Sequence, residues 1–208
     1  MNEERAQRQA MIDRYAAHWP GAIVLPYLGA WPEIDESAFV APGAVVIGNV
    51  TIGAESSVWF NTTLRGDIAP ISVGVRSSVQ DGTVVHVNMD APTVIGDEVT
   101  VGHSALIHGT TIGNGSMIGM GAIVLSYSRI GSGVVVAAGA LIPERMEVPD
   151  GAVMMGIPAK QRDSLSAEQQ ERIAGIGGRY VRVSRNYLAD LRSTVTSEQV
   201  EGEEDPRR

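Results

Sequence analysis

Three of the four histidines in this chain, His86, His103 and His108, lie within a stretch of 23 residues, and the chain contains no cysteine. A single histidine would be interpreted as an ordinary hydrogen-bonded residue, but three together favour a metal site. Without thiolates, a transition metal here has to be bound by imidazole or carboxylate groups. Three imidazoles leave one tetrahedral position of Zn²⁺ open to water, whose pKa the metal lowers to about 7. The three histidines are therefore candidate zinc ligands.

A six-residue repeat of aliphatic side chains runs through the part of the sequence that must position these histidines. This period fits neither an α-helix nor a plain strand, and it is typical of hexapeptide β-helices, in which three hexads form one triangular coil. We therefore predict an all-β, parallel β-helix with an aliphatic interior. The repeat positions are Ile34, Val40, Val46, Ile52, Val58, Leu64, Val73, Val79, Val85, Ile95, Val101, Ile107, Ile112, Ile118, Val124, Ile130, Val136, Ile142, Val148 and Met154.

The repeat predicts where each histidine lies in the coil. His86 and His108 each directly follow a repeat position, and these two positions are three hexads apart. The two imidazoles are therefore expected on neighbouring coils, about 4.8 Å apart. His103 belongs to the preceding hexad, and one side of the triangle is nearly 20 Å long at about 3.3 Å per residue. We expect a neighbouring subunit to supply His103, in a homotrimer with three equivalent shared sites.

The ends of the chain lack the repeat and predict helices. Ser166 and Gln169 form a candidate capping box, and apolar residues then recur at helical spacing. The last residues are highly charged and are expected to be disordered. The predicted organisation is an N-terminal helical extension (1–24), a β-helix domain (25–160), a C-terminal α-helix packed alongside (161–194) and a disordered tail (195–208).

Charge and hydropathy exclude several classes of partner. The formal net charge of −8 argues against nucleic-acid binding, which needs a basic face. No apolar run reaches the roughly 18 residues of a membrane span, so no membrane association is expected. The first residues are polar and contain no hydrophobic core of a signal peptide. The expected location is the cytoplasm.

Three sequence blocks carry a resemblance to a known family. VWFNTTLRGDI (58–68), SSVQDGTVVHV (77–87) and VGHSALIHGTTIG (101–113) are similar to the signature blocks of γ-class carbonic anhydrases, and the likeness extends over roughly residues 25–190. The resemblance implies a left-handed coil. It also implies a trimer in which three histidines bind zinc, iron or cobalt across the subunit interface. The implied activity is that of a lyase, the reversible hydration of CO₂ to bicarbonate by a metal-bound hydroxide.

The same resemblance suggests roles for five further residues. Arg65 and Asp81 resemble the family's ion pair at the subunit interface, and Asp67 resembles the residue that orders its loop. Gln80 is similar to the residue that hydrogen-bonds to the metal-bound hydroxide. Tyr180 resembles a tyrosine that approaches the site from the C-terminal helix. Arg65, Asp67 and Asp81 have a purely structural interpretation as well, because they can serve assembly without touching substrate.

The chain departs from the best-studied members of this family and is similar to a short-loop subgroup. Those members carry an acidic loop with a glutamate that shuttles protons. Here the two interruptions of the repeat, at 68–70 and 88–93, are short and contain no glutamate, and Ser78 stands where an asparagine is frequent. Removal of the proton from the metal-bound water limits fast hydration, so we expect slow or absent turnover.

Three alternatives to the anhydrase remain open from the sequence. The first is a hexapeptide acyltransferase that uses an acyl-CoA, although such enzymes usually depend on one catalytic histidine and a long loop. The second is a metal-dependent thioesterase with the same ligands. The third is a non-catalytic, metal-stabilised trimer that serves as a binding or assembly subunit, and the missing shuttle favours it.

Overall fold

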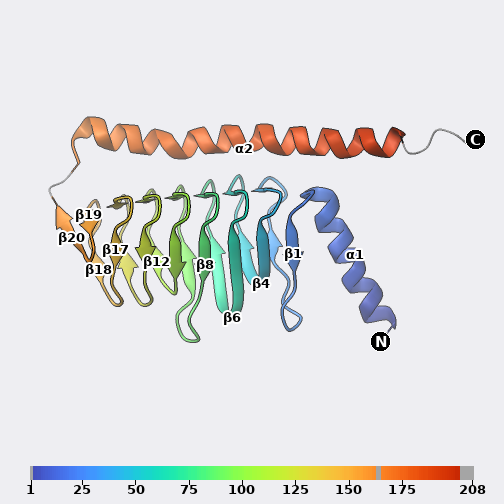
Figure 1. Cartoon of the computed structure of the whole chain (residues 1–208), viewed down its shortest axis with the longest axis horizontal. Helices are drawn as coiled ribbons and strands as arrows, with labels where there is room; N and C mark the ends of the chain where they lie inside the picture. The colour runs from blue at the N-terminus through green and yellow to red at the C-terminus, as the bar shows by residue number, and fades with distance from the viewer. Residues whose placement is uncertain (1, 163–164, 202–208) are drawn as a thin grey trace, which may run out of the picture.

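The structure is a triangular solenoid of short strands with a helix at either end of the chain, as Figure 1 shows. It is a computed structural model that describes residues 2–162 and 165–201. Helix α1 spans Asn2–His18 and helix α2 spans Ala167–Glu201, with twenty strands between them in the described residues. All ladders between successive coils are parallel. The predicted left-handed parallel β-helix is confirmed.

Each of the three faces of the solenoid takes one strand, or one half of a long strand, from every coil. The first face holds β1 (Ile23–Leu25), the first halves of β4 (Val45–Ile52) and β6 (Thr63–Val73), then β8 (Val84–His86), β11 (Leu106–His108), β14 (Ile123–Val124) and β17 (Leu141–Ile142). The second face holds β2 (Glu33–Ile34), the second halves of β4 and β6, then β9 (Thr93–Ile95), β12 (Thr111–Ile112), β15 (Arg129–Ile130) and β18 (Glu147–Val148). The third face holds β3 (Phe39–Val40), β5 (Ser57–Val58), β7 (Ser78–Val79), β10 (Thr100–Val101), β13 (Met117–Ile118), β16 (Val135–Val136) and β19 (Val153–Gly156). A final strand, β20 (Ala159–Arg162), pairs antiparallel with β19 and ends the solenoid.

The repeat positions fill the interior of the solenoid, as the period of six predicts. Every one of them is buried except Ile34, in the first coil, which is partly buried. Glycine follows many of them where backbones of adjacent coils touch. A Cβ on Gly119 would lie 2.4 Å from the amide nitrogen of Ala138, so no larger residue fits there without moving the next coil. The interior and the corners together hold successive coils in register, and this register places the site.

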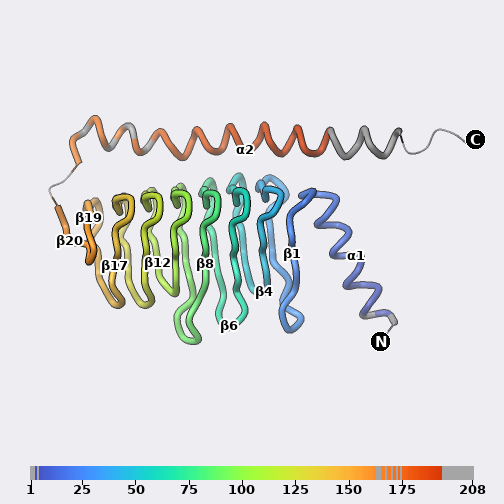
Figure 2. Tube along the Cα trace, in the orientation of Figure 1, coloured from blue at the N-terminus to red at the C-terminus, as the bar shows by residue number. Residues whose placement is uncertain are grey.

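Both helices pack against the solenoid through aromatic residues. Trp19, just beyond α1, donates from Nε1 to the Ala38 carbonyl at 2.8 Å, which anchors the end of α1 to the first coil. Helix α2 runs back along the solenoid, as the trace in Figure 2 makes clear. Its Tyr187 ring stacks on Phe39 with centroids 5.7 Å apart and meets Trp59 edge-on at 5.6 Å. Among the described residues, no helix is long and apolar enough to cross a membrane.

The start of α2 matches the predicted capping box, and its end differs from the prediction. The amide of Ser166 donates to the Gln169 side chain at 2.9 Å, and the amide of Gln169 donates to the Ser166 hydroxyl at 3.2 Å. The helix continues to Glu201, beyond the expected end at residue 194, because no proline or glycine interrupts residues 195–201. The rest of the expected disordered tail, residues 202–208, lies outside the described part of the chain.

Candidate metal centre

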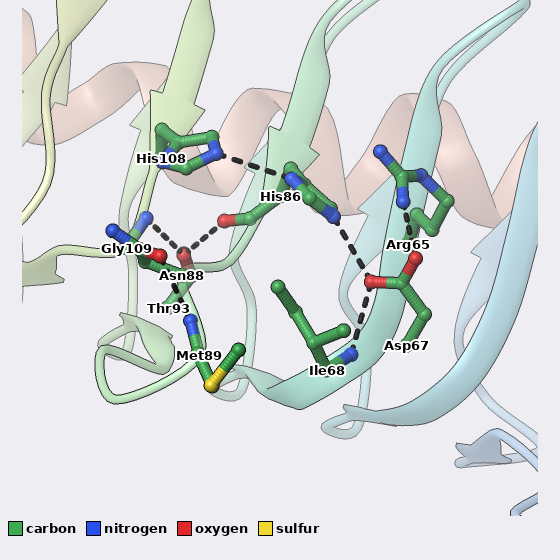
Figure 3. Close-up of polar contacts among 9 residues, drawn as sticks. All are labelled: Arg65, Asp67, Ile68, His86, Asn88, Met89, Thr93, His108 and Gly109. Carbon is green, nitrogen blue, oxygen red and sulfur yellow. Dashed lines mark hydrogen bonds and ion pairs between the residues drawn. The ribbon is translucent and has the colours of Figure 1, made fainter.

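His86 and His108 lie side by side on the first face of the solenoid. They end strands β8 and β11 and are direct partners in the parallel ladder, as the count of three hexads predicts. Because Val85 and Ile107 point into the core, the neighbouring histidines point outward. Figure 3 shows the two rings facing each other, with His86 Nδ1 3.1 Å from His108 Nε2. One chain thus brings two imidazole nitrogens within 3.1 Å of each other.

The outer nitrogen of each ring is held by a polar side chain. His86 Nε2 donates to Asp67 Oδ1 at 2.9 Å, and Asp67 also forms an ion pair with Arg65 through its other oxygen (Figure 3). His108 Nδ1 lies 2.8 Å from the hydroxyl of Ser126, a buried residue on the next coil. A carboxylate behind a ligating histidine fixes its tautomer and raises its basicity. The sequence assigned Asp67 to loop ordering, and the structure adds this contact with His86.

The two facing nitrogens fit a tetrahedral metal ion. Two ligands at about 2.0–2.1 Å from Zn²⁺ with a tetrahedral angle between them lie about 3.3 Å apart. The observed separation of 3.1 Å between His86 Nδ1 and His108 Nε2 is close to that value. Imidazole is a ligand that suits zinc, iron and cobalt alike. The donor set and its spacing are therefore compatible with the predicted cofactor.

The electrostatics of the site favour the protonation states that metal binding requires. Burial lowers the pKa of His108, and the charges of His86, when this ring is protonated, and of Arg65 lower the pKa further, against a weaker opposing effect of Glu144. For Asp67, partial burial alone would raise the pKa. The hydrogen bond from His86 and the contact with Arg65 outweigh this, so the pKa of Asp67 is lowered. At neutral pH His108 is thus a neutral imidazole with a lone pair, and Asp67 is an ionised acceptor.

His103 lies elsewhere on the chain. It occupies the turn after β10, where its Nδ1 is 2.8 Å from Asp81 Oδ2, and both side chains are about two-fifths exposed, at 43% and 41%. Among the described residues, no three His, Cys, Asp or Glu side chains of one chain come together as a metal site. One chain therefore presents a pair of candidate ligands at one place and the third candidate at another.

The other predicted site residues divide between these two places. Gln80 is buried at the end of β7 and directly precedes Asp81, which places it on the His103 side. Tyr180 packs its ring edge-on against Trp59 with centroids 5.7 Å apart, on the face where α2 contacts β5 and β7. Arg65 pairs within its own chain with Asp67, and Asp81 pairs with His103. The predicted Arg65–Asp81 pair would join two chains and stays a prediction.

Two residues of the site, Thr93 and Ser126, were missed by sequence reasoning. The buried Thr93 hydroxyl donates to the His86 carbonyl at 2.5 Å and accepts from the Gly109 amide at 2.9 Å (Figure 3). It therefore ties together the ends of the two strands that carry the histidines. Ser126 could have been found, because it follows His108 by 18 residues, which is one coil of three hexads. Thr93 is the last residue of an interruption of the repeat, and counting hexads does not place it.

Comparison with known proteins finds one family model that matches this chain and curated relatives that include a plant and a bacterial protein. The family described as "Bacterial transferase hexapeptide (six repeats)" matches residues 109–144. The chain is 40% identical over 178 residues to "Gamma carbonic anhydrase 2, mitochondrial" of Arabidopsis thaliana, covering 83% of this chain and 63% of that one. It is 37% identical over 167 residues to "Carbonic anhydrase" of Geobacillus kaustophilus, covering 80% and 92%. The chain therefore spans just under two thirds of the plant relative and most of the bacterial one.

A solved structure carries a different functional name. A Bacillus cereus protein described as a putative acetyltransferase has a TM-score of 0.80 and 37% identity to this chain, covering 81% of this chain and 98% of that structure. The description of this structure agrees with the acyltransferase alternative, whereas both curated relatives are named carbonic anhydrases. The likeness supports the same solenoid in both proteins.

Proposed function

This chain belongs to the γ-class carbonic anhydrase family, and on that premise we propose that it is a carbonic anhydrase that reversibly hydrates CO₂ to bicarbonate at a metal site shared between subunits of a homotrimer. The observation that carries the proposal is the pair of outward-facing nitrogens of His86 and His108, 3.1 Å apart. Each ring is held from behind, so both lone pairs can point at one cation. The third ligand, His103, would come from a neighbouring chain.

An exposed apolar row beside the two histidines supports the shared site. Val84 and Leu106, which precede His86 and His108 by two residues on the same strands, are 43% and 37% exposed. Residues two apart in a strand point to the same side, so the row and the imidazoles share one outer surface. An apolar surface of this kind is typical of a contact between subunits. The register partners of Val84 and Leu106 continue the row: Ile23 is also exposed, Val45, Ile123 and Leu141 are partly buried, and the polar Thr63 interrupts it.

In the proposed trimer, every interface joins the two unlike half-sites of neighbouring chains. One chain would supply His86 and His108 with Asp67 behind them, and the next would supply His103 with Asp81 behind it. Repetition of this contact around a three-fold axis closes a ring with three equivalent sites. A divalent metal bound there would supply a hydroxide nucleophile near neutral pH. The Gln80 amide, next to Asp81, would then hydrogen-bond to the reactants.

The interruption of the repeat at 88–93 offers no free carboxylate for proton transfer. The only acidic residue of the 88–93 loop is Asp90, and it accepts a hydrogen bond from the Tyr127 hydroxyl at 2.7 Å. Arg145 in turn lies over the Tyr127 ring, 4.6 Å from its centroid. Proton release would therefore depend on buffer, which gives slow turnover without added imidazole. The same observation favours the non-catalytic trimer as the second candidate.

A mixed-subunit experiment tests the shared site directly. His103→Ala protein and His86→Ala protein would each be purified, checked for metal content, then unfolded together and reassembled. Each variant alone should hold no stoichiometric zinc. A mixed trimer should regain a complete site wherever a His103→Ala chain supplies His86 and His108 and its neighbour supplies His103. Failure of the mixture to regain zinc, or full zinc in either variant alone, would refute the shared ligand set.

Stopped-flow CO₂ hydration then separates the enzyme from a non-catalytic trimer. The zinc-loaded parent protein should hydrate CO₂, and added imidazole should raise the rate because it replaces the missing proton acceptor. The unmixed variants serve as controls with the same fold and no complete site. If zinc-loaded protein shows no hydration at any imidazole concentration, the anhydrase proposal is wrong and the non-catalytic trimer takes its place.

A further inference from the structure

A line of four hydrogen-bonded side chains crosses successive coils at the candidate metal centre. It runs from Asp67 to His86, from His86 to His108 and from His108 to Ser126, with separations of 2.9, 3.1 and 2.8 Å. The two ends of the line differ in chemistry. The carboxylate of Asp67 can only accept hydrogen bonds, whereas the hydroxyl of Ser126 can donate or accept. This difference determines where the protons of the two rings reside.

Without a metal, the line allows only one arrangement of two neutral rings. Asp67 accepts, so His86 carries its proton on Nε2 and presents a lone pair at Nδ1. His108 Nε2, 3.1 Å from that lone pair, must then carry the proton of the second ring. This leaves His108 Nδ1 as an acceptor, and the Ser126 hydroxyl donates to it. Every polar group in the line then has a partner.

If His86 and His108 held a metal, the arrangement of His108 would reverse. Its Nε2 would have to offer a lone pair to the cation, so the ring proton would reside on Nδ1 and would be donated to the Ser126 oxygen. The ring loses one proton at Nε2 and gains one at Nδ1 by exchange with water, so it stays neutral and no net proton is released from it. A carboxylate or a carbonyl at position 126 could pair with only one of these two states.

We propose that Ser126 is a positioning residue that pairs with both tautomers of His108, so that the Nδ1 atom of this ring has a hydrogen-bond partner both with and without the metal. The proposal rests on the metal site proposed above. It assigns to Ser126 no contact with substrate. Its contribution is to hold the ring in one orientation while the proton moves from one ring nitrogen to the other. Loss of the hydroxyl would leave His108 Nδ1 without this partner in either state.

Nitrogen-15 NMR of histidine-labelled full-length protein at pH 7.5 reads the tautomers without any assay of activity. In metal-free protein, His86 and His108 should both be protonated at Nε2. Addition of Zn²⁺ should move the proton of His108 to Nδ1 and leave that of His86 in place. A metal-free His108 protonated at Nδ1 would overturn the proposal. Because that arm contains no metal, it tests the metal-free half of the proposal even if zinc does not bind and the proposed function fails, and the zinc arm tests the other half.

Zinc affinity of two serine variants supplies the second readout. A bound cation would polarise the ring, so the bond that His108 Nδ1 donates to Ser126 with metal is stronger than the bond that it accepts without metal. Ser126→Ala should therefore bind Zn²⁺ about tenfold more weakly, the lower end of the effect of removing a partner behind a metal ligand. Ser128→Ala is the matched control, because Ser128 is also buried on the same turn but bonds to the Leu125 carbonyl at 2.7 Å and to Thr110 at 2.8 Å. The control should keep its zinc affinity within twofold. Equal losses in both variants, or no loss in Ser126→Ala, would overturn the proposal.

Discussion

Replacement of Asp67 by Asn tests whether the carboxylate behind His86 serves the metal or only the fold. Oδ1 of Asp67 accepts from His86 Nε2 at 2.9 Å and from the Ile68 amide at 3.0 Å, while the other oxygen faces Arg65. If the amide oxygen of Asn takes the place of Oδ1 and accepts from His86, its NH₂ group faces the guanidinium of Arg65, and two hydrogen-bond donors then oppose each other. If the amide turns round, NH₂ faces His86 Nε2 and opposes the tautomer that the metal needs. Both orientations weaken the site.

The magnitude differs between metal affinity and stability. Removing the partner behind a ligating histidine typically costs 10–100-fold in metal affinity, which is about 1.4–2.7 kcal/mol. The ion pair lost with it contributes little to folding, because the Arg65 side chain is 46% exposed, and such pairs are worth roughly 0.2–1 kcal/mol. Asp67→Asn should therefore lose much zinc affinity while metal-free protein loses at most about 1 kcal/mol of unfolding free energy.

Competitive zinc titration with a chelator and urea unfolding of metal-free protein measure the two quantities. Glu98→Gln is the matched control, since it also removes one carboxylate from an exposed ion pair, with Arg76, at a corner away from the histidines. The control should keep the zinc affinity of the parent protein. Zinc affinity within twofold of the parent in Asp67→Asn, or an equal loss in Glu98→Gln, would refute the role of Asp67 as the group that orients His86.

Four further predictions concern the site, helix α2 and the corners of the solenoid. Thr93→Val removes the hydroxyl that joins the two ligand-bearing strands and should lower the urea-unfolding free energy of metal-free protein by about 1–2 kcal/mol, and an unchanged value would contradict this bridge. Gly178→Ala should stabilise α2 by about 1 kcal/mol, because a Cβ there meets nothing within 4 Å. Gly74→Ala should destabilise the solenoid, because its Cβ would lie 2.3 Å from Asp97 Oδ1. Thermal melts should show a higher melting temperature for Gly178→Ala and a lower one for Gly74→Ala than for the parent protein. The pKa of His108 in the folded state is lowered by burial and by neighbouring positive charge. The unfolding free energy of the metal-free protein should therefore fall as the pH drops below about 6.5. In His108→Asn, the unfolding free energy should depend less on pH between about pH 7 and 5.5.

The period of six was enough to predict the solenoid and the pairing of His86 with His108. Both follow from backbone geometry, because three hexads return the chain to the same face and a buried aliphatic residue at every sixth position sets the phase. The same count separated His103 from the pair, since it lies one hexad away and on another face. Each of these inferences depends only on where a residue lies along the coil.

The hydrogen bonds behind the histidines were decided by tertiary structure. The partners along the line of hydrogen bonds are 19 residues apart for Asp67 and His86, 22 for His86 and His108, and 18 for His108 and Ser126. These separations differ because the interruptions of the repeat change the stagger of adjacent coils. The count of three hexads could have placed Ser126 beside His108, but which ring nitrogen each side chain reaches depends also on side-chain rotamers, which a repeat count does not give. Arg65 and Asp67 lie two residues apart on β6 and share one side of the strand. Their pairing in one chain still depends on rotamers, because the sequence alone also allowed Arg65 to pair with Asp81.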